Sequence, residues 1–132
     1  MEFTPIGFVA IGQDLCVDIG PAMGRVPFAC LVDTVLGSVP AVNNALLSCP
    51  EDECLAAVAH EKGHILHPPD PGKLDLAAEI AADAAAARAG HRVGLLKLLG
   101  RIERIIADMG DEYAEVREGL RVRIPKLKEV AS

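Results

Sequence analysis

The chain has 132 residues, of which 51% are hydrophobic and 24% charged, and this predicts one globular domain over residues 1–132. Its net charge of −6 argues against a nucleic-acid partner, which would require a basic face. No apolar run reaches the ~18 residues of a membrane span, and no early Lys or Arg opens a signal peptide, so we expect a cytoplasmic protein without a membrane partner.

The first half of the chain predicts strands and turns. Three short apolar runs, at residues 6–11, 15–19 and 28–36, are separated by segments that contain glycine. A turn signal follows the third run, and residues 39–47 complete a predicted hairpin. Because proline cannot donate to a central ladder, Pro40 places this last arm at the edge of the sheet.

The second half predicts helices. Ser48 and Glu51 have the spacing of a capping box, and the helix that follows them should end at Pro68. Asp75 can cap a second helix over about residues 76–89, which is mostly alanine.

A third helix carries apolar residues at helical spacing over residues 93–109, and a fourth covers about 112–123 and ends at Pro125. We interpret the basic residues at positions 117–128 as a solvated helix face. Together the elements predict an α+β fold, with a small, mostly antiparallel sheet and a helical C-terminal half.

The first predicted helix contains an HExxH motif, His60-Glu61-Lys62-Gly63-His64. Residues four apart lie on nearly the same face of a helix, so both imidazoles can bind one metal ion. Glu61 is rotated by about 100° from His60, which lets it reach a metal-activated water without binding the metal. Gly63 would leave room beside the ion.

A catalytic zinc site needs a third protein ligand, and the predicted ligand is Glu79 on the next helix. Asp83 follows one turn later and can orient His60 by accepting its distal N–H. The alanines around them allow two helices to approach closely. The alternative is that Glu79 and Asp83 form a solvated stripe on an alanine-rich helix.

This pattern resembles the gluzincin metallopeptidases, the clan of thermolysin, and most of all the minimal single-domain minigluzincins. The likeness covers roughly residues 28–109. It implies a zincin-like fold with an active-site HExxH helix and a glutamate helix. It also implies one catalytic Zn²⁺ held by His60, His64 and Glu79, with Glu61 as the general base of a zinc-dependent endopeptidase.

The same likeness extends to the substrate site. Residues 39–48 resemble the clan's upper-rim edge strand, and Asn44-Ala45 matches its Asn-Ala pair, which binds the substrate backbone in an extended form. We expect a shallow cleft that takes peptides or unfolded protein segments.

Gluzincins commonly supply a Tyr, His or Arg that stabilises the developing oxyanion. The candidates here are His91, Tyr113 and Arg117, and of these we expect Tyr113. Two other functions fit the same residues. One is a latent or non-catalytic zinc-binding regulatory module, in which the basic tail after Arg117 could block the zinc. The other is a repressor-cleaving gluzincin-like protease of a mobile element.

Overall fold

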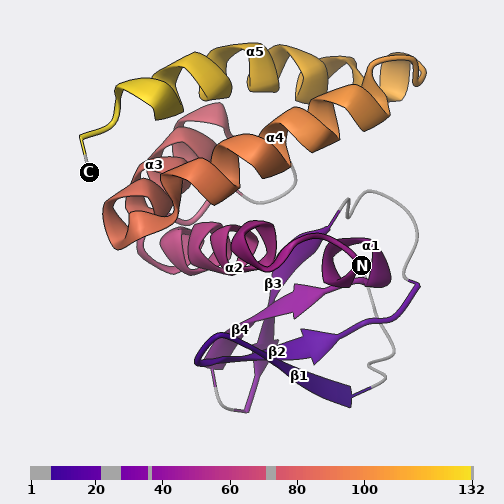
Figure 1. Cartoon of the computed structure of the whole chain (residues 1–132), viewed down its shortest axis with the longest axis vertical. Helices are drawn as coiled ribbons and strands as arrows, with labels where there is room; N and C mark the ends of the chain where they lie inside the picture. The colour runs from indigo at the N-terminus through magenta and orange to yellow at the C-terminus, as the bar shows by residue number, and fades with distance from the viewer. Residues whose placement is uncertain (1–6, 22–27, 36, 71–73, 132) are drawn as a thin grey trace.

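The computed structural model describes residues 7–21, 28–35, 37–70 and 74–131, which form an α+β fold (Figure 1). Its strands are β1 Gly7–Ile11, β2 Asp14–Asp18, β3 Ala29–Thr34 and β4 Gly37–Val42. Its helices are α1 Asn44–Leu47, α2 Glu51–Leu66, α3 Leu76–Ala86, the π-turn η1 Ala87–His91, α4 Arg92–Ile106, the short 3₁₀ turn η2 Asp111–Tyr113 and α5 Ala114–Glu129. In the part of the chain so described, no helix is long and apolar enough to cross a membrane.

The sheet is mixed, and its strand order is β1-β2-β4-β3. The β1–β2 and β3–β4 pairs are antiparallel, whereas β2 and β4 run parallel. The predicted hairpin is therefore present as β3–β4, but the prediction that its second arm lies at the edge is wrong, because β4 is interior and β3 is the edge strand. Pro40 is tolerated because the β2–β4 pairing begins one residue later, at Ala41 opposite Val17.

The prediction of a strand up to residue 47 is also wrong, because the chain turns into α1 after β4. The side chain of Asn43 caps this helix by accepting a hydrogen bond of 3.0 Å from the backbone N–H of Leu46. The Ser48 hydroxyl donates to the carbonyl of Asn44 at the end of α1. It does not form the predicted capping box, and Pro50 precedes α2 without a side-chain cap.

The helix α2 lies between the sheet and the layer formed by α3, α4 and α5 (Figure 1). Its buried side packs against the inner face of the sheet and against α4 in one hydrophobic core, whose members include Ile11, Cys16, Val42, Val58, Leu95 and Leu98. The predicted end of this helix before Pro68 and the predicted cap of α3 by Asp75, which accepts from the N–H of Ala78, are both confirmed.

The last helix continues past Pro125, so the prediction that it ends there is wrong. A proline inside a helix removes one backbone hydrogen bond and crowds the preceding turn. Burial on both sides of it offsets that cost, since Leu120 and Leu127 are each 1% exposed. The helix α5 therefore runs to Glu129 along α3 and α4.

Candidate metal centre

Two closely packed helices carry the residues predicted to bind metal. His60 and His64 lie on α2, and Glu79 lies on α3. The approach depends on Gly63, because a Cβ atom at this position would lie 2.9 Å from the Cα atom of Ala82 on α3. Gly63 therefore leaves room for the neighbouring helix, whereas the sequence suggested that it leaves room for an ion.

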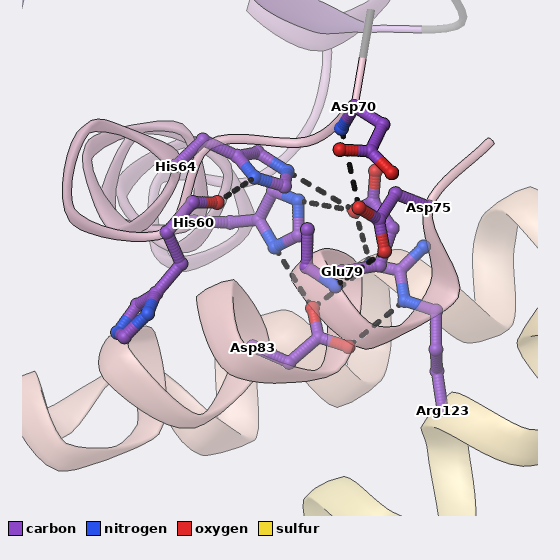
Figure 2. Close-up of polar contacts among 9 residues, drawn as sticks. His60, His64, Asp70, Asp75, Glu79, Asp83 and Arg123 are labelled. Carbon is purple, nitrogen blue, oxygen red and sulfur yellow. Dashed lines mark hydrogen bonds and ion pairs between the residues drawn. The ribbon is translucent and has the colours of Figure 1, made fainter. Parts of the chain in front are cut away.

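The three predicted ligands converge on one point (Figure 2). The Nε2 atom of His60 lies 2.9 Å from Oε2 of Glu79, and Nε2 of His64 lies 3.2 Å from the same oxygen. The potential ligand atoms of the three residues are all within 4.8 Å of one another. Both histidines are buried, and Glu79 is half-buried.

The distal nitrogen of each imidazole faces an oxygen that can accept a hydrogen bond but cannot donate one. Nδ1 of His60 lies 2.8 Å from Oδ1 of Asp83, and Nδ1 of His64 lies 3.3 Å from the carbonyl oxygen of His67. In a neutral imidazole both contacts favour the tautomer with the proton on Nδ1. Each Nε2 atom faces the carboxylate of Glu79 (Figure 2).

This donor set fits zinc. Two imidazole lone pairs and a carboxylate oxygen at these distances repel one another unless protons or a cation lie between them. Two histidines and one glutamate are a ligand set of catalytic zinc sites, in which the fourth position is kept for water. His60, His64 and Glu79 are therefore the residues that would hold the ion.

The pKa values of the site residues favour a protonated His60 and an ionised Glu79. Burial lowers the pKa of His60, but its contacts with Asp83 and Glu79 raise it to about 9. Burial acts in the opposite direction on a carboxyl group and raises the pKa of Glu79. The contacts with His60 and His64 outweigh this effect and hold the pKa of Glu79 well below its usual range. The pKa of Glu61 is raised, chiefly because this carboxyl group is buried.

Asp83 is paired on its far side with Arg123, one of the basic residues predicted to be solvated. Arg123 on α5 donates through Nε to Oδ2 of Asp83 and through Nη2 to Oδ1, both at 2.8 Å. Its Nη2 also lies 3.7 Å from Oε2 of Glu79. The side chain of Arg123 is only 14% exposed, so assigning it to a solvated basic face was wrong.

A signal for this role was present in the apolar spacing of α5. Val116, Leu120 and Leu127 recur at helical intervals, and Arg123 stands in the same series at the position between the two leucines. The two leucines are buried and Val116 is half-buried, so the series marks the inward face of the helix.

The ligands open onto a cavity of about 800 Å³. His60, Glu61, His64 and Glu79 line it on one side, together with residues 28–31 around the start of β3. Large apolar side chains of α4 line it on another side, among them Leu98, Leu99, Ile102, Ile105 and Ile106, and Met109 after the end of α4 also lines it.

The structure separates the remaining predicted residues into two groups. Tyr113 and Ala45 line the cavity, whereas Asn44, His91 and Arg117 are not among the described residues that line it. Arg117 donates to backbone carbonyls at the end of α4. The roles of Tyr113, Asn44 and Ala45 toward a substrate remain predictions.

Comparison of the chain with family models, with curated proteins and with solved structures found no match. What the site can do therefore follows from its own residues and contacts.

Proposed function

We propose that the chain is a zinc-dependent endopeptidase in which His60, His64 and Glu79 hold the ion and Glu61 is the general base. The observation that carries this proposal is the convergence of the three ligand atoms beside the half-buried carboxyl group of Glu61 at a large cavity. The HExxH motif and its likeness to the gluzincins support a zincin-like interpretation of the α+β fold.

Each residue of the site has a distinct task in this chemistry. Zinc, when bound, acts as a Lewis acid that polarises the scissile carbonyl and lowers the pKa of a water molecule. Glu61 takes the proton of the attacking water and later delivers it to the leaving amine. Asp83 holds the imidazole of His60 in the ligating tautomer.

The edge strand β3 offers a place for the substrate backbone. In the sheet of described residues it pairs with β4 on one side only, and Ala29, Cys30 and Leu31 line the cavity. An extended peptide can add to such an edge as a further strand and place its scissile bond beside α2. We therefore assign binding of the substrate backbone to β3, whereas the likeness to the clan suggested residues 39–48.

Metal content and cleavage, measured on matched variants, test the proposal. Wild type, Glu79→Ala and Glu61→Gln are analysed for zinc by mass spectrometry and for cleavage of casein with and without a chelator. We expect one zinc per chain in wild type and Glu61→Gln and its loss in Glu79→Ala, with chelator-sensitive cleavage in wild type alone.

The other outcomes are equally informative. Zinc binding without cleavage would favour a non-catalytic zinc-binding module and overturn the endopeptidase. Absence of zinc from wild type purified with zinc in the buffer would overturn the metal site itself.

A further inference from the structure

The cavity continues beyond the metal ligands as an apolar groove along α4. Its volume of about 800 Å³ lies near the upper end of the roughly 300–1,000 Å³ of ligand pockets, so it has room for several side chains. Ile105 and Met109 on its wall are 54% and 41% exposed. Large apolar side chains that border a cavity and remain this exposed form a surface that an apolar ligand can cover.

Carboxylates border the groove at the turn between α4 and α5. Asp108 and Glu112 are exposed and adjoin the lining residues Met109 and Tyr113 in the sequence, and the exposed Asp111 lies between these two lining residues. Residues 103–121 contain six carboxylates and three basic residues, of which Arg117 donates to backbone carbonyls at the end of α4 and Arg121 pairs with Glu118. This side of the groove therefore carries an excess of negative charge.

The other borders of the groove carry the same sign of charge. Asp33 is exposed on β3 and lies two residues after the lining residue Leu31, on the same face of the strand. Asp70 is exposed and follows the lining residue Pro69. Among the described residues, exposed carboxylates thus border the apolar floor at the α4–α5 turn, on β3 and beside Pro69.

The cationic side chains inside the groove do not reverse this field, because each is paired. Arg101 contacts the two carboxylate oxygens of the buried Glu53 at 2.7 and 3.0 Å. Arg123 is bound in the same two-pronged way to Asp83. The charge that a ligand meets on entry is therefore that of these exposed carboxylates.

We infer that the groove selects extended peptide segments in which aliphatic or aromatic residues are flanked by lysine or arginine. The apolar side chains fill the groove along α4, and the flanking cation lies against the carboxylates of the α4–α5 turn. This inference rests on the proposed function, because it names the substrate class of that site.

Peptide binding tests the inference without requiring cleavage. The Glu61→Gln protein, loaded with zinc, is titrated into three fluorescent peptides, and binding is followed by anisotropy. The first has an apolar segment flanked by Lys, the second the same segment flanked by Glu, and the third the Lys flanks around a glutamine segment. We expect the first to bind about tenfold more tightly than the second at low ionic strength, with a smaller ratio at high salt.

Two pairs of substitutions assign the effect to the groove. Asp108→Asn with Glu112→Gln should reduce the preference for Lys flanks by roughly threefold. Glu118→Gln with Glu129→Gln makes the same change in net charge and should leave the preference unchanged. Glu118 lies about 200° around α5 from the lining residue Val116, so it faces away from the groove.

A third pair tests the apolar wall. Ile105→Thr with Met109→Gln should weaken both apolar peptides about equally and leave the glutamine peptide unaffected. Since both side chains are largely exposed, the fold should tolerate the change, and circular dichroism checks this.

The inference is overturned if the Lys-flanked and Glu-flanked peptides bind alike, or if the variant of Asp108 and Glu112 behaves as its control. Cleavage of the same peptides by wild type separates this inference from the proposed function. Preferential binding of the Lys-flanked peptide without any cleavage would sink the endopeptidase but leave the groove's selectivity standing. Cleavage of both peptides without a preference for the Lys flanks would support the endopeptidase but overturn the inferred selectivity of the groove.

Discussion

Replacing Arg123 by methionine should destabilise the fold. The guanidinium donates two bonds of 2.8 Å to Asp83, whose side chain is 3% exposed. In the variant this buried carboxylate keeps His60 as its partner but loses the guanidinium. Removing one partner of a buried ion pair typically costs ~3–5 kcal/mol. Because His60 retains part of the interaction with Asp83, we expect the free energy of unfolding to fall by about 2–4 kcal/mol.

The same substitution should weaken metal binding. Removing a group that orients a metal-binding histidine typically costs ~10–100-fold in affinity. Arg123 acts on His60 through Asp83, so we expect a loss of about tenfold. Urea unfolding measures the stability, and competition with a chelating dye measures the zinc affinity. A second variant, Arg123→Lys, keeps the charge but not the two-pronged geometry, and should fall between wild type and methionine.

Arg121→Met is the matched control, because Arg121 lies on the same helix and pairs with Glu118 at a surface where both side chains are 69% exposed. Pairs of this kind contribute about 0–1 kcal/mol. If Arg123→Met cost no more stability than Arg121→Met and left zinc affinity unchanged, the reasoning from the buried pair would be refuted. Adding Asp83→Asn to Arg123→Met should recover part of the lost stability, because the unpaired charge is removed.

Three further outcomes are expected. Glu61→Gln should keep its zinc but lower the rate of peptide cleavage by about 10²–10⁴-fold, measured with a fluorogenic peptide. Gly63→Ala should lower the free energy of unfolding in urea by about 1–3 kcal/mol, because its Cβ would lie 2.9 Å from the Cα of Ala82. In chelator-stripped protein the raised pKa of His60 gives stability that is complete below pH 6.5 and lost as the pH rises through about 9. The lowered pKa of Glu79 gives stability that is present above pH 4.5 and lost on acidification, so a plot of unfolding midpoint against pH should peak between these limits.

Much of the candidate site follows from local spacing in the sequence. The placement of His60, Glu61 and His64 on one helix needs only the geometry of residues four apart. Glu79 required more, because two helices had to pack at short range. The run of alanines and the cap at Asp75 indicated that packing, and both features are present in α3.

The order of the strands could not be predicted in the same way. A hairpin signal specifies that β3 and β4 pair, but not which of them accepts the next strand. Pro40 favoured an edge position for β4, yet β2 adds to β4 only from Ala41 onward and so avoids the missing N–H. The edge that faces the cavity is therefore β3, a consequence of long-range pairing that no local pattern contains.

The error over Arg123 came from treating a basic run as one surface. A helix distributes consecutive residues around its axis, so Arg121 and Lys126 are exposed while Arg123 turns inward between Leu120 and Leu127. Burying a guanidinium is unfavourable unless a carboxylate accompanies it.

A buried carboxylate likewise needs a cation beside it, and Asp83, which contacts the metal-binding His60, is such a carboxylate. Burial alone would raise the pKa of Asp83 and favour its neutral form, and its contacts with Arg123 and His60 keep that pKa low. A buried aspartate in this position therefore demands a cation from some other element of the fold. Of the basic residues on α5, Arg123 is the one whose helical position lies within the buried apolar series. The need for a cation beside Asp83 and the apolar spacing of α5 therefore together identify Arg123.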